Sequence, residues 1–141
     1  MTKRGSNKLR QEVRARANRL CEYCYCPECF SLAPFELEHI VPSAKGGITA
    51  SSNLAYACRG CNLNKSDRVQ ARDPITGRRL RLFHPRRQKW GKHFVWSSDY
   101  LLIIGLTATG RATIEALALN RVELVNLRRA LYLCGEHPPI T

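Results

Sequence analysis

The hydrophobic pattern in the first half of the chain predicts a helix, two strands and a second helix. Residues 7–20 carry apolar side chains at helical spacing with basic residues around the remainder, which predicts a basic amphipathic helix. Residues 35–41 alternate as in a strand, which a following proline ends because proline has no N–H for a ladder. Residues 54–57 form the expected return strand, and a helix is expected from Asn62 onward, ending before Asp73.

The second half of the chain predicts a hairpin followed by two helices. An Asp-Pro-Ile-Thr-Gly turn that starts at Asp73 leads into a basic loop. Residues 93–96 and 100–104 flank a short polar turn, as the two strands of a hairpin do. Thr109 and Asn120 precede apolar stripes at helical spacing, so we expect each of them to be the N-cap of a helix.

The chain has 141 residues, which is enough for one ordinary domain or for a small module with an extension. We expect an α+β fold, with one module at residues 1–72 and a small α+β extension at residues 73–141 packed on it. No apolar run approaches the roughly 18 residues of a membrane span, so no membrane partner is expected. The polar, basic start has no apolar signal core, which favours a cytoplasmic protein.

The charge of the chain points to a polyanionic partner. Lys and Arg number 23 against 11 Asp and Glu, which gives a formal net charge of +12. The excess is clustered, because residues 1–20 hold seven basic side chains and one acid, and residues 78–92 hold seven and none. Clustered positive charge favours nucleic acid over solubility alone.

The cysteines are spaced as metal ligands. In a cytoplasmic protein they stay reduced, and two Cys-x2-Cys pairs can close a four-sulfur zinc site. The three pairs are Cys21 and Cys24, Cys26 and Cys29, and Cys58 and Cys61. The first two overlap, and their spacing does not decide which of them faces the third.

A series of ordered residues lies around and between these pairs. The series is Cys21-x2-Cys24, Glu38-His39-Ile-x-Pro42, Gly46-Gly47, Asn53-Leu54 and Cys58-x2-Cys61-Asn62-x2-Lys65. It resembles the HNH endonuclease family, also called ββα-metal or His-Me finger nucleases, over roughly a third of the chain. The resemblance implies a ββα-metal core, preceded by the basic helix, with structural Zn²⁺ on Cys21, Cys24, Cys58 and Cys61.

The resemblance also implies a metal-dependent DNA endonuclease. His39 would be the general base, because a neutral imidazole can take a proton from water near neutral pH. Glu38 and Asn62 would bind one catalytic ion, and oxygen ligands of this kind suit Mg²⁺ or Mn²⁺. Asn53 would bond the loop backbone and orient His39. Many family members have Asp in place of Glu38 and His in place of Asn62, so the metal preference is open.

Contacts to DNA are expected from basic side chains. Lys65 lies one helical turn beyond Asn62 and is expected to contact phosphate, and Arg59, Arg86 and Arg87 are further candidates. Phosphate contacts carry no sequence information, so the target is open. The sequence also leaves open the biological pathway, whether one strand or both are cut, and whether the protein is a monomer or a homodimer.

Two other functions are compatible with the sequence. The first is a zinc-knuckle module that binds nucleic acid without cleaving it. The second is a thiol-based sensor that uses Cys26, Cys29 and Cys134, and these three with His137 have the spacing for a second zinc. His84 and His93 are interpreted as packing or phosphate-contact residues outside the motif, and Trp90 and Trp96 as core anchors rather than base-stacking platforms.

Overall fold

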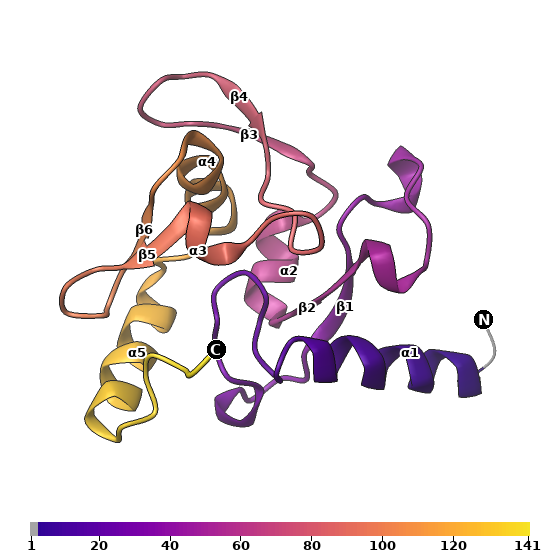
Figure 1. The fold of residues 1–141 in the computed structure, drawn as a ribbon, viewed down its shortest axis with the longest axis horizontal. Coiled ribbons are helices and arrows are strands. Elements are labelled where there is room, and N and C mark those ends of the chain that lie inside the picture. Colours follow the sequence, from indigo (N-terminus) through magenta and orange to yellow (C-terminus); the bar gives the residue numbers. More distant parts are fainter. Residues whose placement is uncertain (1–2) are drawn as a thin grey trace. The chain divides into compact units, whose positions relative to one another are not determined.

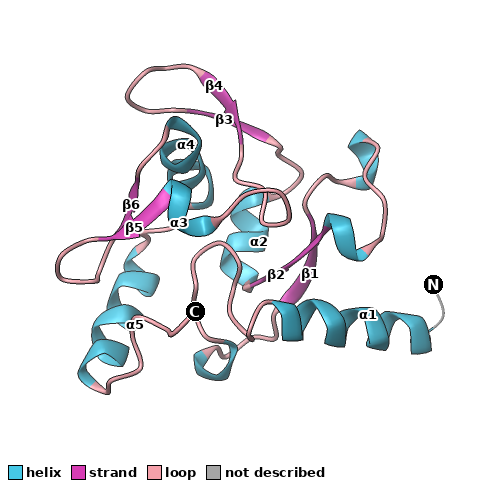
Figure 2. Ribbon diagram, in the orientation of Figure 1, coloured by secondary structure: helices cyan, strands magenta, loops and turns pink. Residues whose placement is uncertain are grey.

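The chain has a mixed α+β fold, as predicted. The computed structural model describes residues 3–141, with side chains described from residue 7 onward. It divides into two compact units, Met1–Arg68 and Val69–Thr141 (Figure 1). The sheets are all small, two-stranded and antiparallel (Figure 2). Within the described residues no helix has the length and apolar character needed to cross a membrane.

The N-terminal unit contains two α-helices, one hairpin and three short 3₁₀ helices. Its elements are α1 (Lys3–Arg16), η1 (Glu28–Phe30), β1 (Glu36–His39), η2 (Ser43–Lys45), η3 (Ser51–Asn53), β2 (Leu54–Ala57) and α2 (Arg59–Lys65). In the hairpin Glu36 lies opposite Ala57 and His39 lies opposite Leu54. All residues of β2 are buried, so this strand is the centre of the unit.

The basic helix expected at residues 7–20 is α1, which ends at Arg16. The chain leaves the helix because Asn18 and Arg19 adopt positive φ angles of 54° and 58°. The arginines of α1 hold the hairpin, since Arg10 donates to the Phe35 carbonyl at 2.8 Å and Arg16 to the Leu54 carbonyl at 2.8 Å. Part of the basic face is therefore used inside the unit.

The helix expected from Asn62 onward and ending before Asp73 was placed too late in the chain, because Gln70–Arg72 is strand β3. The observed α2 begins at Arg59, where the Cys58 sulfur accepts the Cys61 N–H at 3.4 Å as the N-cap. Residue preferences for N-caps do not include cysteine, so the residue pattern did not indicate this start. The helix ends at Lys65, because Ser66 turns the chain with a φ of 53°.

The C-terminal unit contains two hairpins and three helices. Its elements are β3 (Gln70–Arg72), β4 (Arg79–Arg81), α3 (Trp90–His93), β5 (Phe94–Trp96), β6 (Ile103–Gly105), α4 (Ala108–Leu117) and α5 (Val122–Leu133). The predicted hairpin is confirmed as β5 and β6. The expected turn at Asp73 is also present, but it joins β3 and β4, which the sequence pattern did not predict.

Both predicted helix caps of this unit were wrong. Helix α4 is capped by Thr107, whose hydroxyl accepts the Gly110 N–H at 3.0 Å, rather than by Thr109. Asn120 caps no helix. Its amide instead bonds the Ile103 backbone twice, accepting from the N–H at 2.8 Å and donating to the carbonyl at 2.9 Å. An amide with two such partners ties β6 to the start of α5.

Candidate functional site

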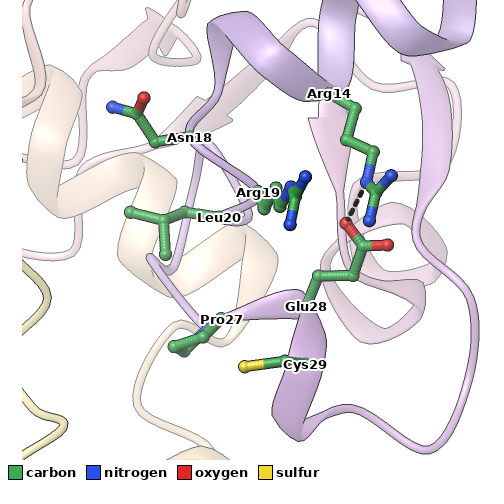
Figure 3. Close-up of a pocket in the computed structure, with 7 residues that line it drawn as sticks. All are labelled: Arg14, Asn18, Arg19, Leu20, Pro27, Glu28 and Cys29. Carbon is green, nitrogen blue, oxygen red and sulfur yellow. Dashed lines mark hydrogen bonds and ion pairs between the residues drawn. The ribbon is translucent and has the colours of Figure 1, made fainter.

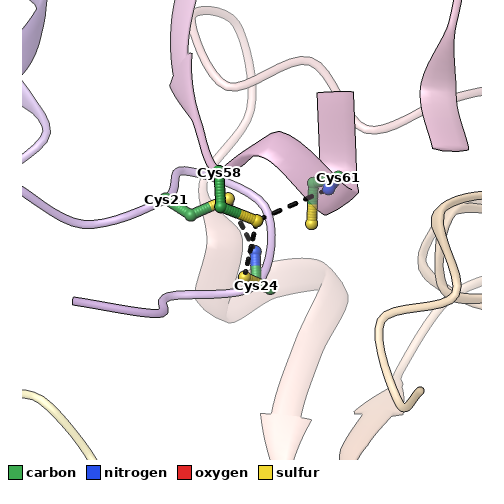
Figure 4. A group of neighbouring side chains, drawn as sticks. All are labelled: Cys21, Cys24, Cys58 and Cys61. Atoms are coloured by element: carbon green, nitrogen blue, oxygen red, sulfur yellow. Dashed lines mark hydrogen bonds between the residues drawn. The ribbon is translucent and has the colours of Figure 1, made fainter. Parts of the chain in front are cut away.

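Four cysteine sulfurs meet in the interior of the N-terminal unit. Cys21 and Cys24 follow α1, whereas Cys58 and Cys61 lie at the start of α2 (Figure 4). All four are buried and their sulfur atoms lie within 4.8 Å of one another. The Cys24 and Cys58 sulfurs are 3.7 Å apart, close to the edge of about 3.8 Å in a tetrahedron with Zn–S bonds near 2.3 Å. The predicted pairing is confirmed, and the donor set fits zinc.

Backbone N–H groups support each cysteine pair. The Cys24 N–H donates to the Cys21 sulfur at 3.5 Å, as the Cys61 N–H does to Cys58. Hydrogen bonds from Cys21 and its neighbours lower the pKa of the Cys58 thiol, while burial raises the pKa of Cys21. Zinc binding releases thiol protons, so a bound ion would hold all four sulfurs as thiolates.

The remaining cysteines lie outside this group. Cys26 is buried with its sulfur 3.6 Å from the Pro27 carbonyl, and Cys29 and Cys134 are exposed. His137 is buried in the C-terminal unit, where its Nε2 lies 2.7 Å from the Tyr100 carbonyl oxygen. No further group of three or more His, Cys, Asp or Glu ligands is found among the residues that the structure describes.

His39 is the last residue of β1 and is partly exposed. Its Nε2 lies 2.9 Å from the Thr49 hydroxyl. The segment between them is closed by the buried Asn53, whose amide accepts the Val41 N–H at 2.9 Å and donates to the carbonyls of Val41 and Ile48 at 2.9 and 2.8 Å. One side chain therefore fixes both ends of the loop that follows His39.

The two glycines of this loop have different reasons to be glycine. Gly46 has a φ of 89°, a conformation that other residues rarely adopt. Gly47 is crowded instead, because a Cβ there would lie 1.7 Å from the Val41 carbonyl oxygen and 2.8 Å from the Asn53 amide nitrogen. A side chain at Gly47 would push the loop off the Asn53 amide.

Glu38 and Lys65 form a buried ion pair. The Lys65 Nζ lies 2.6 Å from the Glu38 Oε1, and Tyr23 donates to the other carboxylate oxygen at 2.6 Å. Burial raises the pKa of Glu38, and Lys65 and Tyr23 oppose that rise by stabilising the carboxylate. Burial also raises the pKa of the Tyr23 hydroxyl well above its usual value, and the Glu38 charge adds to the effect.

Lys65 also holds the backbone at the end of β1. Its ammonium donates to the Ile40 carbonyl at 2.9 Å and to the His39 carbonyl at 3.3 Å. Only 1% of the residue is exposed, whereas a phosphate contact was expected. In this arrangement Lys65 positions the backbone of His39, while Arg59 on the first turn of α2 is exposed.

Asn62 contacts a carboxylate that was not singled out in the sequence. Its Nδ2 donates to Glu36, which lies two residues before Glu38 on β1. Residues two apart on a strand share a face, so both carboxylates face α2. No hydrogen bond joins Glu38 to Asn62 in the described part of the chain, and strand alternation alone would have identified Glu36.

The remaining predicted DNA contacts, Arg86 and Arg87, lie in the C-terminal unit between β4 and α3. Their backbone N–H groups donate to the Nδ1 of His84 at 3.2 and 3.3 Å. Arg87 is exposed and Arg86 is half-buried. His84 therefore fixes the loop that carries both arginines.

A pocket of about 360 Å³ lies between the end of α1 and η1 (Figure 3). At its rim the Arg14 Nε lies 2.9 Å from a carboxylate oxygen of Glu28. The lining residues are Arg14, Asn18, Arg19, Leu20, Pro27, Glu28 and Cys29. None of them is a motif residue, so this pocket is separate from the loop that carries His39.

Comparison with known proteins gives a match to a protein-family model. The family model described as HNH endonuclease matches residues 21–68, a span that contains all four clustered cysteines and every motif residue from Glu38 to Lys65. A match to this family model indicates a nuclease-type function with a metal site. No curated protein and no solved structure matches the chain.

Proposed function

We propose that the HNH endonuclease domain at residues 21–68 makes this protein a metal-dependent endonuclease that hydrolyses phosphodiester bonds in DNA. The observation that carries the proposal is the support around His39. The backbone of the three residues from His39 to Val41 is held by two buried side chains, Lys65 and Asn53. Such support keeps a general base in a fixed place, which catalysis requires.

His39 is suited to activate water. If its Nε2–H donates to Thr49, the Nδ1 lone pair is left to accept a proton. The water oxygen then attacks phosphorus, its proton moves to His39, and the bond from phosphorus to the leaving oxygen breaks. A positioned base of this kind contributes about 10²- to 10⁴-fold to the rate.

We propose that Asn62 and Glu38 hold the catalytic ion, Mg²⁺ or Mn²⁺. The donors fit, because carboxylate and amide oxygens are the ligands these ions prefer. With its Nδ2 on Glu36, Asn62 keeps its Oδ1 for a metal, and Glu36 is then the residue that orients it. A divalent ion there offsets the negative charge that grows on the phosphate and the leaving oxygen.

The Lys65 ammonium competes with an ion at Glu38, since it already places a positive charge 2.6 Å from the carboxylate. On ion binding, Glu38 would either share its carboxylate between Lys65 and the ion or release Lys65 in favour of the ion. We therefore expect Glu38→Gln and Asn62→Ala to raise the Mg²⁺ concentration needed for half-maximal cleavage. A variant with unchanged metal dependence would remove that residue from the ligand set.

A plasmid-nicking assay tests the proposed function. Wild type should convert supercoiled plasmid to nicked or linear forms with Mg²⁺ or Mn²⁺, and EDTA should stop the reaction. His39→Ala should lose about 10²- to 10⁴-fold in rate while it keeps its zinc and its affinity for DNA. If wild type binds DNA but cuts nothing, whichever divalent ion is added, the function is that of a zinc-knuckle binding module.

A further inference from the structure

The β3–β4 hairpin of the C-terminal unit carries an arginine face. Arg72 lies opposite Arg79, and Gln70 lies opposite Arg81, while Ala71 and Leu80 pair between them. Directly paired residues in an antiparallel hairpin share a face. Gln70, Arg72, Arg79 and Arg81 are all exposed, and the Ala71 and Leu80 side is half-buried.

The hairpin is firmly anchored in its unit. Asp73, the first residue of its turn, is fully buried and accepts two hydrogen bonds from Arg111 of α4, both at 2.9 Å. The same carboxylate accepts from the hydroxyl of Thr76 and from the N–H of Ile75, which closes the turn. Both strands pack on α4. The arginine face is therefore presented by a rigid ribbon.

Within the described residues, no carboxylate pairs with the arginines of this face. Arg72 donates to the Gly77 carbonyl at 3.0 Å. The side chains of Arg79 and Arg81 form no ion pair or hydrogen bond with any residue that the structure describes. Asp73 is the one acid in residues 70–81, and Arg111 occupies it. Like charges directly across a hairpin are destabilising, so the arrangement favours an external anion.

The spacing of the arginines suits a nucleic-acid backbone. Residues two apart on an antiparallel strand, such as Arg79 and Arg81, are separated by about 6.8 Å. Along one DNA strand successive phosphates rise by about 3.4 Å along the axis and lie farther apart through space because the strand winds around it, so the two arginines can reach neighbouring phosphates. Guanidinium groups bind phosphate through paired N–H donors, and a two-stranded ribbon is narrow enough to enter the major groove of DNA.

We infer that the β3–β4 ribbon is a docking surface for duplex DNA, with Arg72, Arg79 and Arg81 on phosphates. The inference rests on the proposed function for its choice of DNA over other polyanions. It assigns to the C-terminal unit, outside the residues that match the nuclease family, a direct part in substrate binding. The inferred docking surface does not include Arg86 or Arg87.

The test compares two full-length variants that lose the same charge. The ribbon variant carries Arg72→Gln, Arg79→Gln and Arg81→Gln, and the control variant carries Lys89→Gln, Lys92→Gln and Arg129→Gln, which are also exposed. Binding to a fluorescein-labelled 30-base-pair duplex is followed by anisotropy over a salt series without added divalent ions. Zinc content and thermal unfolding show whether both variants are folded.

The ribbon variant should bind at least tenfold more weakly at 0.1 M salt, and its slope of log K against log salt should become less steep by about 2 to 3. The control should change much less. Equal weakening in both variants overturns the inference, as does an effect on anionic vesicles or duplex RNA that leaves DNA binding unchanged. Binding is measured without cleavage, so an inactive wild type would refute the nuclease proposal and leave this result standing.

Discussion

The ammonium of Lys65 lies 2.6 Å from the Glu38 carboxylate, and the two side chains are 1% and 2% exposed. A pair so deeply buried is worth little as an attraction alone, because both charges have lost their water. Its value is geometric. Lys65 reaches from α2 to the carbonyls of His39 and Ile40, so the pair joins the helix to the end of the strand that carries His39.

Lys65→Met should destabilise the N-terminal unit by about 3–5 kcal/mol, because it leaves the Glu38 carboxylate buried without a cation. The measurement is urea unfolding of the folded, zinc-bound protein. Lys8→Met, at an exposed position of α1, serves as the control and should stay within about 0.5 kcal/mol. Adding Glu38→Gln to Lys65→Met should recover part of the loss. A cost no larger than that of the control would contradict the buried ion pair.

Gly47→Ala should disturb the loop after His39 while leaving the cysteine centre intact. The new Cβ would lie 1.7 Å from the Val41 carbonyl oxygen, so the loop must shift, at a cost of about 1–3 kcal/mol. A shift of about 1 Å in the position of a general base can lower the rate about 10²-fold. Nicking rate, zinc content and thermal unfolding are measured together.

Gly91→Ala is the matched control, since a Cβ at Gly91 meets nothing within 4 Å. It should leave both stability and nicking at the wild-type level. If Gly47→Ala also keeps wild-type stability and nicking, the close packing of Gly47 against Val41 and Asn53 does not help to hold His39 in place.

The cysteine centre should hold one zinc ion per chain. Cys61→Ser removes a buried ligand and should abolish zinc binding and unfold the N-terminal unit, because a structural zinc contributes its binding energy to folding. Metal content by mass spectrometry and helix content by circular dichroism report the two effects. Cys26→Ser and Cys29→Ser should retain the metal. Loss of zinc in either of these would show that the ligand set differs from the four clustered sulfurs.

The sequence predicted the cysteine centre and the hairpin around it because both leave local signals. Paired cysteines have a fixed spacing, although the choice of Cys21 and Cys24 over Cys26 and Cys29 came from the family resemblance, and the strand ending at His39 alternates until a proline stops it. The burial of Lys65 has no such signal, since a lysine after an asparagine on a short helix is usually exposed. Its position depends on Glu38, which lies 27 positions earlier in the numbering, and such pairings are set by tertiary packing.

The β3–β4 hairpin was missed for a related reason. Each strand has three residues with a single apolar side chain, Ala71 or Leu80, and this is too short to show a period of two. The Asp73 turn was recognised, but the residues on either side read as a helix end and a basic loop. What makes them strands is their packing on α4, to which Asp73 is tied through Arg111.

The Asp73 carboxylate should make the C-terminal unit sensitive to acid. Arg111 holds the pKa of Asp73 well below its usual 3.8. A carboxyl whose pKa is lower in the folded than in the unfolded state adds stability above the unfolded pKa, and that stability is lost as the pH falls below it. Wild type should therefore lose urea resistance from pH 5 toward pH 2.

Asp73→Asn should be less stable than wild type at pH 7, and this difference in the free energy of unfolding should narrow as the pH falls. Asp99→Asn, at an exposed turn, gives the comparison for a carboxyl whose pKa is lowered chiefly by hydrogen bonds from Ser97 and the Leu101 N–H rather than by an ion pair. If the difference in stability between wild type and Asp73→Asn stays constant from pH 7 to pH 2, the carboxylate charge does not anchor the β3–β4 hairpin to α4.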